Sequence, residues 1–104
     1  MSLNAKQRQT TRDELHANRD LSGLSTRQLC ESLDFTDEQL QRAMDADPAT
    51  DPADVWLLRD FVEQVVRDRG LEPRPFTVLT EGSRGAANRW FGLRQAPPTP
   101  SAEG

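Results

Sequence analysis

The chain has 104 residues, a length typical of one domain, with 35% hydrophobic residues and a net charge of −4. It contains no stretch near the roughly 18 apolar residues that a membrane span needs, and its first residues lack the apolar run of a secretory signal. Cys30 is the single cysteine, which excludes an internal disulfide and a cysteine-based zinc cage. We therefore expect a protein of the reducing cytoplasm with no membrane partner.

The charge is unevenly distributed along the chain. Residues 1–30 carry +2, residues 31–54 carry −7 and residues 55–104 carry +1. The acidic excess is thus confined to one block, which bears on any nucleic-acid partner because duplex DNA attracts positive charge.

The first predicted helix covers residues 5–21, which contain no Gly or Pro. Asn4 is a good N-cap, and Gly23 suits the left-handed position just past a helix. The apolar content of this helix is thin, so we expect it to lie on the surface of another element.

Two capping boxes predict two short helices, the second of which lies in the acidic block. Ser25 with Gln28 begins a helix that ends near Leu33, and Thr36 with Gln39 begins a helix that ends near Met44. Joined through Asp34-Phe35, they form a helix-turn-helix at residues 25–45.

The apolar pattern of this pair resembles that of lambda-repressor-like DNA-binding domains. Such a motif needs an apolar and a small residue on the first helix, apolar residues at its end and in the turn, and two on the second helix. These places are filled, in order, by Leu29, Cys30, Leu33, Phe35, Leu40 and then Ala43 or Met44. Cys30 is expected to be an inert packing group. Asp34 stands where Gly is usual, but Asp tolerates a left-handed conformation. The alternative is any two short core helices joined by a turn.

Residues 52–69 form the most hydrophobic predicted helix. Asp51 is its N-cap, Pro52 suits the first helical position and Gly70 ends it. Its wide apolar face indicates either the central core helix or a helix shared between the subunits of a homodimer.

The remaining residues are predicted as a connector, a last helix and a tail. A short extended segment near 76–79 either forms a strand or places side chains in the core, and Thr80 caps a helix over about 81–91. The Pro-rich residues 94–104 are expected to be disordered. The fold class is therefore all-α, with about five helices in a single domain over residues 3–93.

The candidate DNA- or partner-facing residues lie on the second helix of the pair. In a repressor-like geometry this helix enters the major groove, with its early outward residues at the base edges. Those residues are Thr36, Asp37, Glu38, Gln41, Arg42 and Asp45. Three of the six are carboxylates, and the surrounding negative charge opposes binding to phosphates. DNA is thus a candidate partner that the acidic helix disfavours.

The sequence favours neither catalysis nor a cofactor or metal. His16 is the single histidine and is expected to lie on a helix surface beside Asp13 and Asp20. The carboxylates of residues 31–54 do not match the spacing of a calcium loop. No nucleophile has a base in a recognisable motif, so we expect a protein that is not an enzyme.

Several short segments together resemble a family of small bacterial proteins, domain of unknown function 2316. They are residues 1–8, 21–25, 54–59, 75–79 and 89–93. The resemblance covers nearly the whole chain except the Pro-rich tail. It implies a helix-turn-helix-related fold and no catalytic residues.

Two functional hypotheses follow. The first is a small DNA-binding transcriptional regulator, active as a homodimer and presenting residues 36–45 to the groove. The second is a protein–protein interaction module that keeps the fold without DNA binding, with its acidic block facing a basic partner. In both hypotheses the apolar helix at residues 52–69 is the candidate subunit contact.

Overall fold

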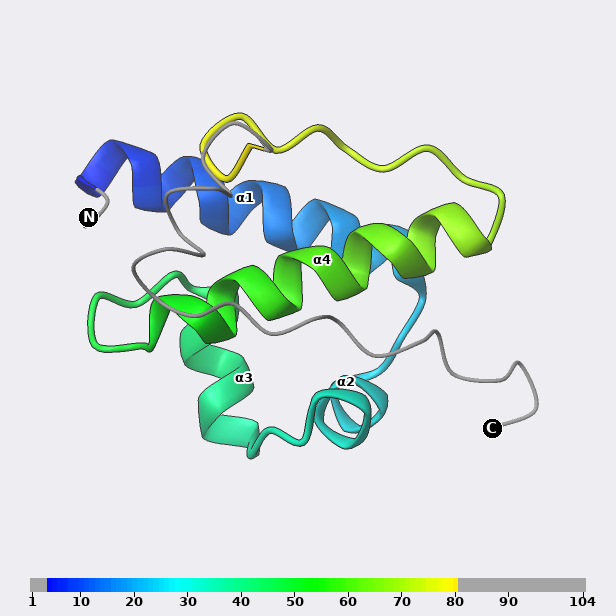
Figure 1. The fold of residues 1–104 in the computed structure, drawn as a ribbon, viewed down its shortest axis with the longest axis horizontal. Coiled ribbons are helices and arrows are strands. Elements are labelled where there is room, and N and C mark those ends of the chain that lie inside the picture. Colours follow the sequence, from blue (N-terminus) through cyan, green and yellow to red (C-terminus); the bar gives the residue numbers. More distant parts are fainter. Residues whose placement is uncertain (1–3, 81–104) are drawn as a thin grey trace.

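The computed structural model describes residues 4–80, which form four helices and no strand. The helices are α1 (Ala5–Ser22), α2 (Thr26–Leu33), α3 (Asp37–Met44) and α4 (Pro52–Asp68) (Figure 1). The all-α class is confirmed. The helix predicted over residues 81–91 and the tail at 94–104 lie outside the described residues.

The two short helices begin where their capping boxes predict. The Ser25 hydroxyl accepts from the Gln28 N–H at 3.1 Å, and the Gln28 side chain accepts from the Ser25 N–H at 2.8 Å. Thr36 and Gln39 repeat this exchange at 3.1 and 3.0 Å. Each box satisfies two backbone groups that a helix start would otherwise leave unpaired. The sequence-local signal is therefore enough to place both starts.

Asp34 makes the turn between α2 and α3. Its φ of 57° and ψ of 45° lie in the left-handed region, as predicted for this position. The next residue, Phe35, donates its N–H to the Cys30 carbonyl at 3.0 Å and has a buried ring. The chain thereby changes direction sharply, and α2 is seen nearly end-on in Figure 1 while α3 is seen from the side. Residues 26–45 are thus two crossed helices rather than one rod.

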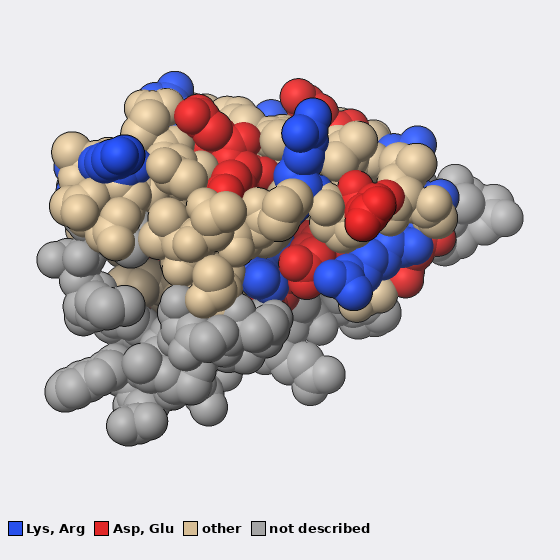
Figure 2. Space-filling model, turned by 90° about the horizontal axis from the view of Figure 1, so that it is seen from above, with Lys and Arg blue, Asp and Glu red and all other residues tan. Residues whose placement is uncertain are grey.

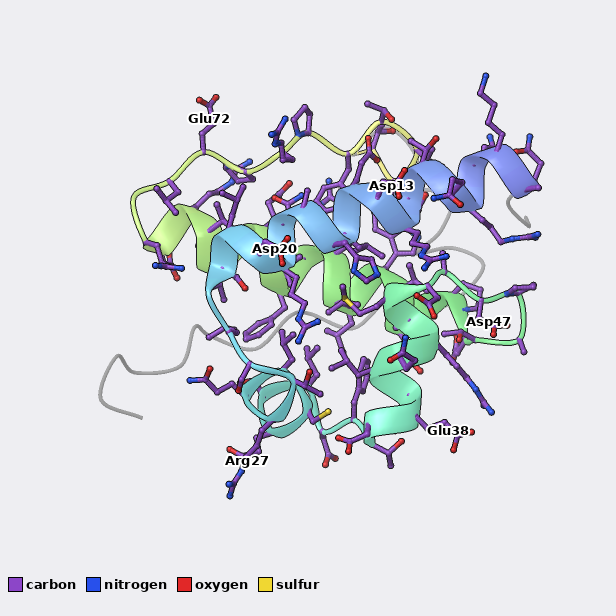
Figure 3. The ribbon with its side chains drawn as sticks, turned by 180° about the vertical axis from the view of Figure 1, so that it is seen from behind. Asp13, Asp20, Arg27, Glu38, Asp47 and Glu72 are labelled. Atoms are coloured by element: carbon purple, nitrogen blue, oxygen red, sulfur yellow. The ribbon has the colours of Figure 1, made fainter. Side chains whose placement is uncertain are left out.

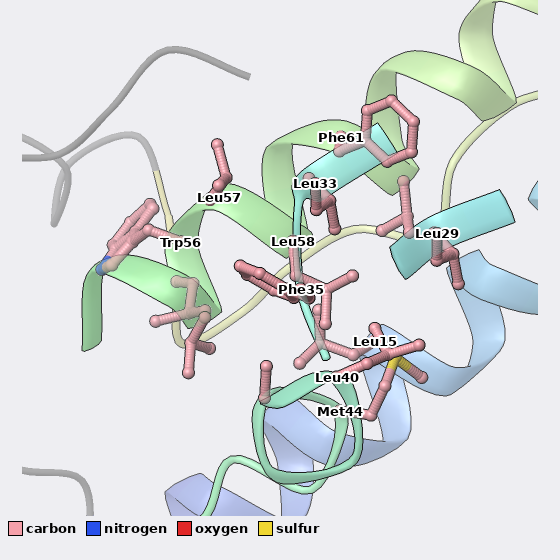
Figure 4. Packing of buried hydrophobic residues seen from close by; sticks show 14 of the residues in the cluster. Leu15, Leu29, Leu33, Phe35, Leu40, Met44, Trp56, Leu57, Leu58 and Phe61 are labelled. Atoms are coloured by element: carbon pink, nitrogen blue, oxygen red, sulfur yellow. The ribbon is translucent and has the colours of Figure 1, made fainter. Parts of the chain in front are cut away.

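α4 is the central helix of the core. Its start follows the prediction, because the Asp51 carboxylate accepts from the Ala53 N–H at 3.0 Å and Pro52 occupies the first turn. Residues 55–59 are all buried, so this part of α4 is enclosed on every side. Figure 4 shows Leu29, Leu33 and Phe35 packed around Leu58 and Phe61, and α4 thereby joins α2 and α3 to the rest of the molecule.

α1 packs along α4 with a face that is largely polar. Its fully buried side chains follow helical spacing but include one leucine only, in the series Thr11, Leu15, Asn18 and Ser22. Asn4 caps the helix and Gly23 ends it at a φ of 69°, both as predicted. Within this stripe, Asn18 hydrogen-bonds to the backbone of Arg74, far along the chain, whereas Ser22 Oγ bonds to Arg19 and Leu24 at its own end of the helix.

Residues 71–80, which we call the strap, return from the end of α4 along α1 and α4 (Figure 1). The strand considered near 76–79 does not form; residues 77–79 make a bend. The other reading was right, because Phe76 and Leu79 insert their side chains into the core. A lone strand has no neighbour to complete its backbone hydrogen bonds, and here side chains of α1 and α4 satisfy them instead.

The C-terminal ends of α1 and α4 are joined by Arg69. Its guanidinium donates to the Leu21 carbonyl at 2.9 Å, which satisfies one of the carbonyls left free at the end of α1. The guanidinium lies where a Cβ on Gly23 would be. Gly23 is therefore required twice, for its positive φ and for the space that Arg69 occupies.

Candidate functional site

The six predicted partner-facing residues form one surface, which we call the α3 face: Thr36, Asp37, Glu38, Gln41, Arg42 and Asp45. The first five are exposed and Asp45 is half-buried. Figure 3 shows Glu38, together with Arg27 of α2, pointing away from the body of the molecule. The structure thus brings the predicted residues together on the outer side of α3.

Both arginines of α2 and α3 are paired with carboxylates. Arg42 Nη2 donates to Glu38 Oε1 at 2.7 Å, and Arg27 Nε donates to Glu31 Oε1 at 2.9 Å. Residues 26–45 contain these two basic residues and five acidic ones, which gives a net charge of −3. The remaining acidic side chains therefore make the charge of this surface negative.

The polar groups of the α3 face are also largely engaged with their own neighbours. The Thr36 hydroxyl caps α3, and Gln41 Nε2 donates to Asp45 Oδ2 at 3.1 Å. For Gln41 to read a base edge, it would have to give up this bond. Asp37 and Glu38 are the exposed carboxylates of the first turn of α3.

Asp45 connects the α3 face to α1. Its Oδ1 lies 3.5 Å from Arg12 Nε and 3.7 Å from His16 Nε2. His16 was expected beside Asp13 and Asp20 on its own helix, but the contact is with a carboxylate of α3. No sequence signal links residues 29 positions apart; the crossing of α1 and α3 brings them together.

Cys30 packs against the core as expected, but it is only partly buried. It is half-buried, and its Sγ donates to Asp37 Oδ1 at 3.4 Å. Partial burial, and then the hydrogen bond and the negative charge of Asp37, raise the pKa of the Cys30 thiol. The thiol therefore stays protonated and couples the end of α2 to the start of α3.

Two side chains outside the α3 face were missed by sequence reasoning. Asn18 exchanges two hydrogen bonds with the backbone of Arg74, and Arg59 is 3% exposed beneath the strap. The sequence contained a signal for both residues, because each is a polar residue at a position on the core-facing side of its helix.

The face formed by α1 and the strap has a mixed surface. Figure 2 shows Lys and Arg side chains interspersed with Asp and Glu there. Within residues 4–80, no group of His, Cys, Asp and Glu could hold a metal ion, and no helix is long and apolar enough to cross a membrane.

The fold and the α3 face define a small helical protein with a crossed helix pair and an acidic outer helix. The chain belongs to a family described as uncharacterized proteins conserved in bacteria, domain of unknown function 2316, which matches residues 1–92. This confirms the family indicated by the sequence segments. No curated protein and no solved structure matches the chain significantly.

Proposed function

We propose that this chain is a non-catalytic protein-interaction module that binds a basic segment of a partner protein through the α3 face. The observation that carries the proposal is the charge of this exposed surface. Each arginine of α2 and α3 is already paired within its own helix, with Glu31 or with Glu38, while Asp34 and Asp37 stay exposed outside these pairs. Such a surface attracts lysine and arginine side chains and repels a phosphate backbone.

Little apolar surface supports a homodimer through residues 52–69. The apolar side chains of α4 from Val55 to Val66 are each at most 8% exposed. A stable subunit contact needs an apolar patch that is still accessible. The proposed partner surface is therefore α3, not α4.

The test is capture of a basic protein from a bacterial lysate, followed by titration with the purified partner. The variant Asp34→Asn/Asp37→Asn/Glu38→Gln removes three negative charges from the α2–α3 surface. Exposed ion pairs contribute about 0.5 kcal/mol each, so we expect the affinity to fall about tenfold. Because the attraction is between exposed charges, added salt weakens binding of the original chain and has less effect on the variant.

A matched control removes the same charge elsewhere. Asp13, Asp20 and Glu72 are exposed and lie on α1 and the strap, away from α3 (Figure 3). Their triple change to the corresponding amides should leave partner affinity within about twofold, since exposed charges beyond a Debye length of about 10 Å are screened. If both variants lose the partner equally, net charge and not the α3 face governs binding, and the proposal fails.

DNA binding through α3 is the second candidate function. The crossed arrangement of α2 and α3, with Gln41 and Arg42 on the outer side, favours it. Its test is a gel shift with mixed-sequence duplex DNA at low salt, where phosphate contacts are strongest. A shift that Arg42→Ala weakens would favour a regulator and overturn the interaction module; no shift would exclude this candidate.

A further inference from the structure

A hollow of about 440 Å³ lies at the C-terminal end of α4, between the last turns of this helix and the start of the strap. Its walls are Glu63 and Arg67 of α4 and residues 70–75. Figure 1 shows α3 beneath the other end of α4, so the hollow is separate from the α3 face. Its volume falls in the range of small-molecule sites, about 300–1,000 Å³.

Leu71 gives the hollow an exposed apolar wall. Its N–H donates to the Val66 carbonyl at 3.1 Å, and Gly70 before it has a φ of 78°, which is a common way to end a helix. The residue after such a glycine usually packs on the last turn of the helix. Leu71 is nevertheless 44% exposed, the large hydrophobic side chain that stays exposed among residues 4–80. Pro73 and Pro75 line the same hollow and extend its apolar surface.

Arg74 carries an exposed side chain on a fixed piece of backbone. Asn18, which is fully buried, accepts from the Arg74 N–H at 2.9 Å and donates to the Arg74 carbonyl at 3.0 Å. The prolines on either side restrict the backbone angles of this segment further. Among residues 4–80, no carboxylate forms an ion pair with the Arg74 guanidinium. The fold thus fixes the position of a cation that it does not itself neutralise, and such preorganisation lowers the entropy cost of binding.

Arg67 is the second cation of the hollow and is weakly engaged. Its Nη2 lies 3.7 Å from Glu63 Oε1, and its side chain is 61% exposed. The same Glu63 oxygen lies 3.4 Å from Nη1 of the buried Arg59, which already neutralises part of the charge of this carboxylate. Exposed pairs of this kind contribute little to stability. Arg67 is therefore available to an anion in the hollow.

The charges around the hollow favour a ligand with a single negative charge. Guanidinium groups donate paired hydrogen bonds to the oxygens of carboxylates and phosphates. Glu63 and Glu72 also line the hollow, although Figure 3 shows Glu72 pointing away from the body of the molecule. These two acidic residues balance the charge of the two arginines, which disfavours a doubly charged phosphate more than a carboxylate.

We propose that the hollow is a binding site for a small carboxylate with an apolar body. Arg67 and Arg74 bind the carboxylate, and Leu71 with the two prolines contacts the apolar part. The ligand joins the end of α4 to the strap, because the two arginines belong to separate elements.

NMR titration with 3-phenylpropionate tests this site. The ligand should shift the backbone amide signals of Leu71 and Arg74 saturably, with a Kd on the order of 1 mM, as expected for so few contacts. The neutral 3-phenylpropionamide has the same shape and cannot form charge-assisted bonds, so it should bind at least about fivefold more weakly. Acetate keeps the carboxylate but leaves Leu71 uncovered, so it should also bind more weakly than 3-phenylpropionate.

Variants assign the binding to these residues. Arg67→Gln and Arg74→Gln should each lower the affinity for 3-phenylpropionate about fivefold. Arg74→Gln retains the two bonds to Asn18, because they involve only the backbone of residue 74. Leu71→Ser should lower the affinity for 3-phenylpropionate and leave that for acetate unchanged.

Arg27→Gln is the matched control, since it removes an exposed arginine of α2. It should bind 3-phenylpropionate as the original chain does. Equal affinity for the acid and its amide, or equal affinity of the Arg27→Gln and Arg74→Gln variants, would overturn the proposal. Signals of Leu71 and Arg74 that do not shift at the highest soluble concentration of the acid would overturn it as well.

Discussion

At the scale of single residues, Cys30 shows how one contact lowers the reactivity of a thiol. Its pKa is raised by partial burial and then by Asp37, to which its Sγ donates. The thiolate is the reactive form, so a raised pKa slows alkylation at neutral pH.

We predict that Asp37→Ala speeds alkylation of Cys30. The change removes an acceptor that favours the thiol and a negative charge that opposes the thiolate, so the pKa of Cys30 falls and the thiolate fraction rises at any pH below it. The measurement is the rate of iodoacetamide labelling against pH, with Glu38→Ala as the control on the same helix. Equal rates in both variants would contradict the role given to Asp37.

Arg59 is a charged residue whose burial depends on several partners. Besides the Leu79 carbonyl, its guanidinium contacts Asp60 Oδ1 at 2.9 Å and Glu63 Oε1 at 3.4 Å. Arg59→Met keeps much of the side-chain volume but removes the guanidinium's hydrogen bonds to the Leu79 carbonyl and to these two carboxylates. We expect the free energy of unfolding to fall by about 2–3 kcal/mol, measured by urea denaturation.

The control for Arg59 is another arginine of α4. Arg67 also contacts Glu63, at 3.7 Å, but its side chain is 61% exposed. Arg67→Met should change the free energy of unfolding by no more than about 0.5 kcal/mol. A similar loss in the two variants would mean that burial of Arg59 contributes nothing.

At the scale of elements, the backbone of the turn between α2 and α3 is strained, and a substitution at Asp34 could relieve this strain. Asp34 is exposed with a φ of 57°, a conformation that costs a residue with a Cβ more than glycine. Asp34→Gly should raise the free energy of unfolding by about 0.5–1 kcal/mol, and Asp34→Ala should lower it, both by thermal denaturation. If Asp34→Gly instead lowers the free energy of unfolding, the exposed Asp34 side chain makes a stabilising contact.

Gly23 and Gly70 form a matched pair at the ends of α1 and α4. Both have a positive φ, but only at Gly23 would a Cβ meet another side chain, the guanidinium of Arg69. Either change to alanine should cost about 1 kcal/mol in backbone strain. Gly23→Ala should cost about 1 kcal/mol more, because Arg69 loses its bond to the Leu21 carbonyl.

The extra cost at Gly23 can be assigned by a double-mutant cycle. In an Arg69→Ala background the guanidinium is absent, so Gly23→Ala and Gly70→Ala should become equal in their effect on the free energy of unfolding. A difference that persists there would point to another obstacle beside Gly23.

At the scale of the whole molecule, the strap closes the structure by binding to α1, which lies far from it along the chain. Asn18 and Arg74 are separated by 56 positions, and Asn18 is fully buried. Asn18→Ala leaves both backbone groups of Arg74 without partners, and we expect a loss of about 2 kcal/mol in the free energy of unfolding. Amide hydrogen exchange at Arg74 and Thr77 should accelerate first, because the strap opens before the core does.

Gln9→Ala is the control on the same helix. Gln9 is exposed and its side chain donates to Asp13 of the same helix, so exchange at the strap amides should be unchanged. If the two variants affect the strap alike, the fraying of α1 rather than the Asn18 bonds explains the effect.

The four helices of residues 4–80 were readable from the sequence because their signals are local. Asn4, Ser25, Thr36 and Asp51 each satisfy backbone groups within three positions, and Asp34 needs only a conformation that its own residue type tolerates. The composition of the α3 face was readable for the same reason, since the capping box sets which residues of the helix point outward.

The contacts between distant segments were decided by the tertiary structure alone. Three contacts join segments that the sequence does not relate. Asp45 lies near Arg12 and His16, Arg59 donates to the Leu79 carbonyl, and Asn18 hydrogen-bonds to the backbone of Arg74. Such contacts depend on the angles at which whole helices cross, and these angles follow from the packing of many side chains at once. Periodicity and capping act over a few residues, so they determine where the helices are but not which of their polar side chains meet.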